Sequence, residues 1–206
     1  TSDGEPTLVR IHKAGEGTVL GFQEPVRRDE GRMLQAWLNR VALDSAGRDT
    51  LVTVWMARPL LMVWGPQGDL QRTLRLPVPY PLREPSQGER SPPPPSGAAG
   101  PPPRLPLVFD VVTSSVAVAP GGDRVAVASS LTPVQWDEPD RTPGGERSAW
   151  AVDLFARDGT WLGRQPLADG TAAPLLEWEL DGLYLLDPMG SGQVRRYAVA
   201  RPGPPG

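Results

Sequence analysis

The single histidine and the lack of cysteine limit the chemistry that this sequence can perform. His12 stands in the run Val9–Lys13, which has the composition of an exposed strand. A serine-based nucleophilic site would have to use this one histidine, and zinc or iron centres need clusters of histidines, cysteines or carboxylates. The chain has no cysteine, so disulfides and thiol chemistry are excluded. We therefore expect no catalytic residue, no metal ligand and no cofactor, and a protein that is not an enzyme.

Two groups of carboxylates have compositions that acid–base chemistry or calcium would use. Glu177 and Glu179 are two residues apart, which places both on one face of a strand and Trp178 on the other. Paired carboxylates act as acid and base or bind Ca²⁺, but a solvated strand face opposite a buried tryptophan explains them more simply. The acidic stretch 137–140 lacks the glycine spacing of a calcium loop. We interpret both groups as surface features.

Charge and hydropathy argue against two further classes of partner. Lysine and arginine number 21 against 24 aspartates and glutamates, for a formal net charge of -3, and they are scattered. A protein that binds nucleic acid needs a basic patch or stripe, because phosphate neutralisation supplies most of that affinity. No apolar run approaches the roughly 18–20 residues that span a bilayer. We expect protein partners, no nucleic acid and no transmembrane segment within this chain.

The 7 tryptophans are unusual beside 3 phenylalanines and 3 tyrosines. Five fall in predicted strands, where packing between blades explains most of them: Trp55, Trp64, Trp150, Trp161 and Trp178. Trp37 and Trp136 lie outside clear strands and next to loops. Because aromatic residues are enriched at binding hot spots, we expect Trp37 and Trp136 to contact a partner protein.

Short strands separated by glycine-containing turns must position all of these residues. Their order repeats, and the predicted strands are 40–43, 51–55, 59–64 and 70–76, then 115–119, 124–130, 149–155 and 160–167, then 175–180, 183–186 and 193–200. Two N-terminal runs, 8–13 and 18–22, look like the second half of one copy. Each full copy is a four-stranded meander of about 40 residues once insertions are discounted, which is the period of a propeller blade. A β-sandwich is the alternative.

We therefore expect an all-β chain of about three blades in an incomplete ring. Residues 1–76 hold N-terminal blades, a partial one at 1–32 and a full one at 33–76, and residues 107–200 hold the C-terminal blades. Between them, residues 77–106 contain 12 prolines and are expected to form a linker or long loop. A proline-rich recognition motif is the alternative there. Residues 201–206 are expected to be a flexible tail.

The strand pattern resembles the six-bladed propellers of the NHL-like and TolB-like kind. The residues that carry this resemblance are Leu61–Pro77 and Val152–Leu167, in which an aliphatic strand leads through a glycine turn into a second strand. The resemblance implies binding of proteins or ligands, frequently on exported bacterial proteins. It carries over no functional residue, because the best-known enzymes of this kind use metal held by histidines and only His12 is present.

An incomplete ring leaves blade faces uncovered, and uncovered apolar faces mark interaction sites. Three explanations stay open for the missing blades. They lie in an upstream part of a longer precursor, or the chain associates with itself or a partner subunit that completes the ring, or the arc is a flatter stack of sheets docked onto a larger assembly. We expect a non-catalytic binding or scaffolding module that docks onto protein partners in a larger assembly. The alternative is a part of a propeller lyase or hydrolase whose catalytic residues lie outside this chain.

Overall fold

The computed structural model describes the following stretches of the chain, to which all structural statements refer: residues 7–12, 19–23, 41–46, 50–66, 68–84, 86–87, 107–136, 149–171, 173–187 and 192–198. These stretches contain 14 strands, β1 to β14, and no helix. The strands form four sheets, and every pairing is antiparallel. The predicted all-β fold is confirmed.

The first meander consists of β3 (Val41–Ala46), β4 (Thr50–Trp55), β5 (Leu60–Trp64) and β6 (Leu70–Arg75), paired in that order. Its strands are rich in β-branched and aromatic residues, and glycine, proline and aspartate stand in the turns between them. Local propensity and sheet pairing therefore agree. These are the strands that the sequence predicted before the proline-rich stretch.

The second meander consists of β8 (Leu107–Val118), β9 (Arg124–Trp136), β10 (Trp150–Ala156) and β11 (Trp161–Pro166). A short fifth strand, β7 (Ser86–Gln87), pairs with the start of β8. β7 lies within the stretch expected to be a linker, of which the structure describes residues 77–84 and 86–87. The sheet thus contains the predicted four strands and one that the sequence did not indicate.

β8 and β9 are longer than the strands predicted at 115–119 and 124–130. The additional residues pair the start of β8 with the end of β9, across register shifts between Val111 and Thr113 and between Thr113 and Ser115. A bulged ladder of this kind leaves backbone groups unpaired and so accommodates Pro133 inside β9. The strand predicted from the sequence ended at residue 130, and a proline normally ends a central strand.

The third sheet has three strands, β12 (Leu175–Glu179), β13 (Gly182–Leu186) and β14 (Val194–Tyr197). A separate hairpin pairs β1 (Thr7–His12) with β2 (Val19–Gln23). The sequence predicted both groups as partial copies of the repeat. Two of the sheets are therefore complete four-stranded meanders and the third lacks an outer strand among the described residues.

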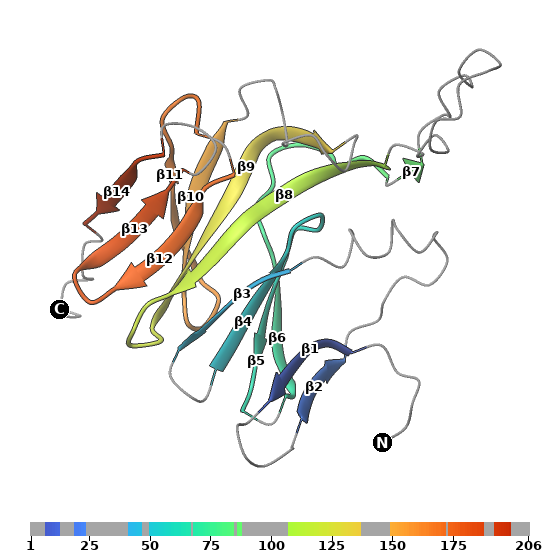
Figure 1. Ribbon diagram of the computed structural model, residues 1–206, viewed down its shortest axis with the longest axis vertical. Helices are drawn as coiled ribbons and strands as arrows, with labels where there is room; N and C mark the ends of the chain where they lie inside the picture. The colour runs from blue at the N-terminus through green and yellow to red at the C-terminus, as the bar shows by residue number, and fades with distance from the viewer. Residues whose placement is uncertain are drawn as a thin grey trace, which may run out of the picture.

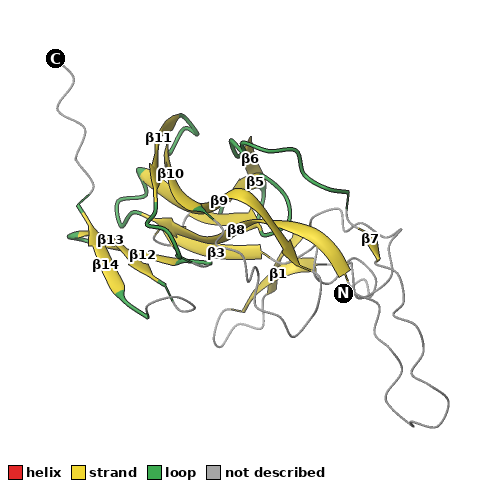
Figure 2. Ribbon diagram, turned by 90° about the horizontal axis from the view of Figure 1, so that it is seen from above, coloured by secondary structure: helices red, strands yellow, loops and turns green. Residues whose placement is uncertain are grey.

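The β8–β11 sheet lies between the β3–β6 sheet and the β12–β14 sheet (Figures 1 and 2). The first strands of the three sheets meet, because β8 contacts β3 and also β12. The β3–β6 and β12–β14 meanders therefore both start beside β8 and run outward from it. The described sheets do not close into a ring, so the prediction of blade-like sheets in an incomplete array is confirmed.

The two faces of the middle sheet differ because valine and alanine alternate along β8 and β9. The valines face the β3–β6 sheet and form one core with Phe155 and with the buried aliphatic residues Val52, Val54, Leu61 and Leu76. The alanines face the β12–β14 sheet, where Leu176, Leu183 and Leu185 fill the space that small side chains leave. Burial of each of these leucines contributes about 1.5–3 kcal/mol.

Three consecutive hydroxyl residues of β8 connect the middle sheet to both neighbours. Thr113 donates from Oγ1 to the carbonyl of Trp55 at 2.7 Å, on the β3–β6 side. Ser114 donates to the carbonyl of Pro174 at 2.6 Å, and Ser115 Oγ accepts the N–H of Leu176 at 3.0 Å, both on the β12–β14 side. These bonds occupy the bulged part of β8, where the ladder to β9 is irregular.

Residues 77–84 run from β11 past β9 to β8 and are attached to each of these strands. The Pro77 carbonyl accepts a hydrogen bond from Arg164 of β11, and the Tyr80 hydroxyl bonds to Ser130 of β9. The Arg83 N–H donates to the buried carboxylate of Asp110 in β8 at 2.9 Å. Composition predicts a linker or long loop here, and polar contacts of Pro77, Tyr80 and Arg83 attach the start of this segment to the middle sheet.

Candidate functional site

The β12–β14 sheet has one face packed on the middle sheet and one face turned away from it. Side chains alternate along β12, so Leu176 and Trp178 point toward the middle sheet while Leu175, Glu177 and Glu179 point outward. The register carries this division into β13 and β14. We call the side that points away from the middle sheet the outward face.

Three aliphatic side chains form a row across the outward face. Leu175 is paired with Leu186, and Leu186 is paired with Val194, so the three are direct cross-strand neighbours. Their exposed fractions are 45%, 36% and 63% in that order. Side chains in such positions lie about 4.5–5.5 Å apart at Cβ. The row is therefore one continuous apolar strip that crosses all three strands.

A polar cluster lies beside this row on the same face. The Tyr184 hydroxyl donates to the Asp181 carboxylate at 3.0 Å, and Arg196 Nη2 contacts the same carboxylate at 3.3 Å and the Asp181 carbonyl at 2.7 Å. The hydrogen bond to Asp181 raises the pKa of Tyr184 above its usual value of 10.0. Glu177 is the cross-strand neighbour of Tyr184. The outward face thus joins an apolar strip to charges of both signs.

The other large sheets do not expose such a row. One face of the β3–β6 sheet is turned away from the middle sheet. It holds four buried side chains, Leu51, Trp55, Met62 and Trp64. Its polar groups are satisfied within it, since Trp64 Nε1 donates to Thr53 Oγ1 at 2.9 Å. The middle sheet has core on both sides. Among the sheets whose side chains are described, the outward face is the one with an uncovered aliphatic row.

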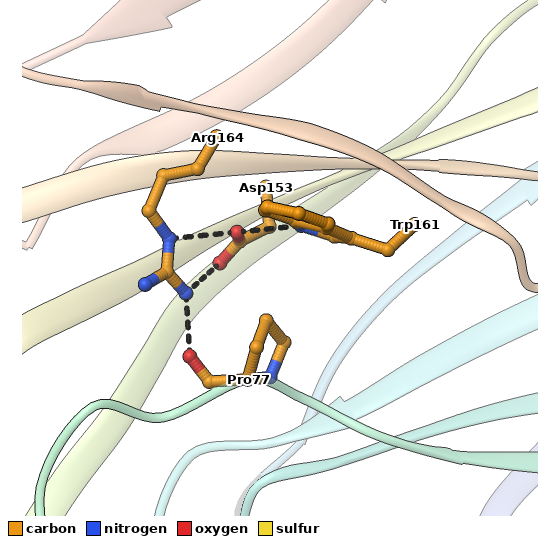
Figure 3. A network of polar contacts seen from close by, with 4 residues as sticks. All are labelled: Pro77, Asp153, Trp161 and Arg164. Carbon is orange, nitrogen blue, oxygen red and sulfur yellow. Dashed lines mark hydrogen bonds and ion pairs between the residues drawn. The ribbon is translucent and has the colours of Figure 1, made fainter.

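Trp161 is a second exposed group, and a buried acid fixes its orientation. Its indole Nε1 donates to Asp153 Oδ1 at 3.1 Å, while Arg164 binds both oxygens of the same carboxylate and reaches the Pro77 carbonyl (Figure 3). The interpretation of Trp161 as a residue packed between sheets is wrong, because 52% of the residue is exposed. Trp55, Trp64 and Trp150 are fully buried. Trp150 packs with Phe109 and Val134 of the middle sheet, whereas Trp55 and Trp64 pack within the β3–β6 sheet.

The structure does not describe the side chains of Trp37 and Trp136, the two tryptophans that we expect to contact a partner. Trp37 lies outside the described residues, and Trp136 ends β9 opposite Phe109, with its side chain outside them too. His12 ends β1 in the same way. The expected partner contacts of Trp37 and Trp136 therefore stay predictions.

The two glutamates of β12 lie as predicted, both exposed, with Trp178 half-buried on the other side of the strand. The acidic stretch 137–140 is outside the described residues. Within the described stretches, no three histidine or acidic side chains are close enough to hold a metal ion. The same stretches contain no helix with the length and apolar character that a membrane crossing requires.

The aliphatic row was not among the predicted sites, although the sequence contains a signal for it. Leu175 and Leu176 are adjacent in β12, and Leu185 and Leu186 are adjacent in β13. Adjacent leucines in a strand put apolar groups on both faces, which is typical of strands buried on both sides. The structure adds that, among the described residues, nothing covers one of these two faces fully.

No protein-family model and no curated protein matches the sequence. Among solved structures, the chain is similar to a crystal structure of a member of the DUF4221 family from Bacteroides vulgatus. The two chains share 11% sequence identity at a TM-score of 0.48, over 88% of this chain and 53% of that one. This chain thus spans about half the length of that protein. A likeness of this degree assigns neither a family nor a function.

Proposed function

We propose that this chain is a non-catalytic binding or scaffolding module whose sheets are blades of a propeller of the NHL-like or TolB-like kind. It docks onto a protein partner through the outward face of the β12–β14 sheet. The supporting observation is the cross-strand row of Leu175, Leu186 and Val194, which is exposed on the face of the β12–β14 sheet that points away from the middle sheet. Contiguous exposed apolar surface of this kind marks interaction sites in soluble proteins.

The chemistry beside the row supports a protein as the partner. Glu177 and Arg196 are the next residues on this face along β12 and β14, and Asp181 pairs with Arg196, so charges of both signs lie beside the apolar row. Protein interfaces have this composition, with an apolar core and a polar rim. A surface for nucleic acid would be uniformly basic. The partner is therefore expected to present an apolar strip of its own to the outward face.

The native mass of the protein in the cells that produce it tests this proposal. We expect a complex larger than the 22.2 kDa chain, measured by native mass spectrometry. Leu186→Glu places a charge in the middle of the row and should release the chain as a monomer. Leu180→Glu is the matched control, because Leu180 is 87% exposed at the β12–β13 turn and stands outside the row. A wild-type monomer, or an unchanged complex in Leu186→Glu, would contradict the proposal.

A further inference from the structure

The β12–β14 sheet lacks a strand that the two other large sheets have. In the first meander β6 pairs outside β5, and in the second β11 pairs outside β10. β14 occupies the place of β5 and β10, and no described residue pairs with its outer edge. An open edge presents a row of unpaired N–H and C=O groups, which is a template for another strand.

The turn before β14 shows which backbone groups are available. The Asp187 N–H donates to the Gln193 carbonyl at 3.3 Å, so Gln193 turns its backbone groups toward β13. Successive residues of a strand point their backbone groups to alternate sides. Arg195 and Tyr197 therefore also bond toward β13, while Val194 and Arg196 direct their N–H and C=O groups outward. These are the groups that an added strand would pair with.

The charge on β14 determines what kind of segment fits. Two of its four residues are arginines, and Arg195 forms no ion pair with any described carboxylate. A second copy of β14 paired antiparallel over its length would place arginine opposite arginine, which is unfavourable. The sequence after β14, residues 201–206, contains three prolines, which have no N–H for a ladder. Neither self-pairing nor this tail fits the edge.

We propose that β14 accepts an acidic extended segment of the partner protein as the fourth strand of its sheet. Carboxylates of that segment face Arg195 and Arg196, and apolar side chains face Val194 and Tyr197. This inference rests on the proposed function, since it states the chemistry of the partner that covers the outward face. Strand addition supplies backbone hydrogen bonds, and the side chains opposite the arginines supply specificity.

Two capped peptides test this pairing directly on the full chain. One has the sequence Thr-Val-Glu-Glu-Val-Thr, and in the other two lysines replace the glutamates. We expect the glutamate peptide to slow amide hydrogen exchange at Val194 and Arg196, and the lysine peptide to bind about tenfold more weakly by calorimetry, a difference of about 1.4 kcal/mol. Equal binding of both peptides, or protection confined to other strands, would overturn the proposal.

Two substitutions separate backbone pairing from side-chain contacts. Val194→Pro removes an outward N–H and should weaken the glutamate peptide about tenfold, whereas Val194→Thr keeps the N–H and should bind it as the wild type does. The Arg195→Glu variant should bind the lysine peptide more tightly than the glutamate peptide. This variant tests the proposal even if Val194→Pro does not fold. Unchanged peptide preference in Arg195→Glu would contradict the charge pairing.

The same peptides distinguish failure of this inference from failure of the proposed function. Leu186→Glu alters the outward face but leaves the edge of β14 intact, so peptide protection should persist in that variant. If the peptide protects β14 while Leu186→Glu leaves the native complex unchanged, the face proposal is wrong and the edge pairing stands. If Leu186→Glu dissociates the complex while neither peptide protects β14, the edge pairing is wrong.

Discussion

Arg164 holds the fully buried carboxylate of Asp153 through two hydrogen bonds, from Nε to Oδ1 at 2.8 Å and from Nη2 to Oδ2 at 2.9 Å. The same Nη2 donates to the Pro77 carbonyl at 2.6 Å. The pair thus joins β10 and β11 of the middle sheet to the chain that leaves β6 (Figure 3). Planar, two-point geometry of this kind suits arginine and would not be reproduced by lysine.

Removing one member of this pair should destabilise the fold strongly. Arg164→Ala leaves a buried carboxylate with only the Trp161 N–H, and we expect the free energy of unfolding to fall by about 3–5 kcal/mol. Urea denaturation measures it. The double variant Asp153→Leu with Arg164→Leu should lose less than Arg164→Ala does, because no isolated charge remains. Equal or greater loss in the double variant would show that packing, and not the buried charge, dominates.

Ser115 should hold the third sheet against the second. Ser115→Ala removes the acceptor of the Leu176 N–H, which is buried, and we expect a loss of about 1–3 kcal/mol together with faster exchange of that amide. Thr113→Val is the matched control, since Thr113 bonds on the opposite side, to Trp55. It should leave the Leu176 amide unchanged. Faster exchange at Leu176 in both variants would indicate that β8 loosens as a whole.

Two glycines with the same backbone conformation should respond differently to alanine. Gly159 has φ of 88° and Gly170 has φ of 84°, so each alanine is strained by about 1–2 kcal/mol. A Cβ at Gly159 would also lie 2.7 Å from Leu74 Cδ2, whereas nothing lies within 4 Å at Gly170. Gly159→Ala should therefore lower the thermal midpoint clearly more than Gly170→Ala. Equal shifts would mean that Leu74 moves aside freely.

The stability of the protein should fall at alkaline pH partly through Tyr80. Burial is the main cause that raises the pKa of Tyr80 above 10.0, and the charge of Asp110 adds to it. The folded chain therefore keeps this proton at pH values where the unfolded chain has released it. The contribution of Tyr80 to the free energy of unfolding is thus constant below about pH 10 and decreases above it. Tyr80→Phe should flatten that decrease. Unchanged alkaline unfolding in this variant would contradict the assignment.

Most strands follow from the sequence because their signals are local. Runs of valine, leucine and tryptophan between turns with glycine and aspartate define β3 to β6 and β10 to β14 within a few residues. The alternation of valine and alanine in β8 and β9 also indicates two differently packed faces. Local pattern fails where pairing between distant residues decides the outcome, as in β7 and in the part of β9 that follows Pro133.

The candidate site follows from the sequence less completely. Glu177 and Glu179 could be assigned to one strand face from their spacing alone. The exposure of Leu186 and of Trp161 could not, because burial depends on which sheet covers which face. The attachment of residues 77–84 also had no local signal, since its partners Asp110, Ser130 and Arg164 are 27 to 87 residues away along the chain.

β8 lies between the β3–β6 sheet and the β12–β14 sheet, and this position affects the order in which the sheets unfold locally. A sheet array of this kind behaves as a chain of units coupled only to their nearest neighbours. The β12–β14 sheet is coupled at one face, so a single interface opposes its detachment, whereas the middle sheet is held at two. Without a partner, native-state hydrogen exchange should therefore find a graded opening that starts at β14 and reaches β8 last.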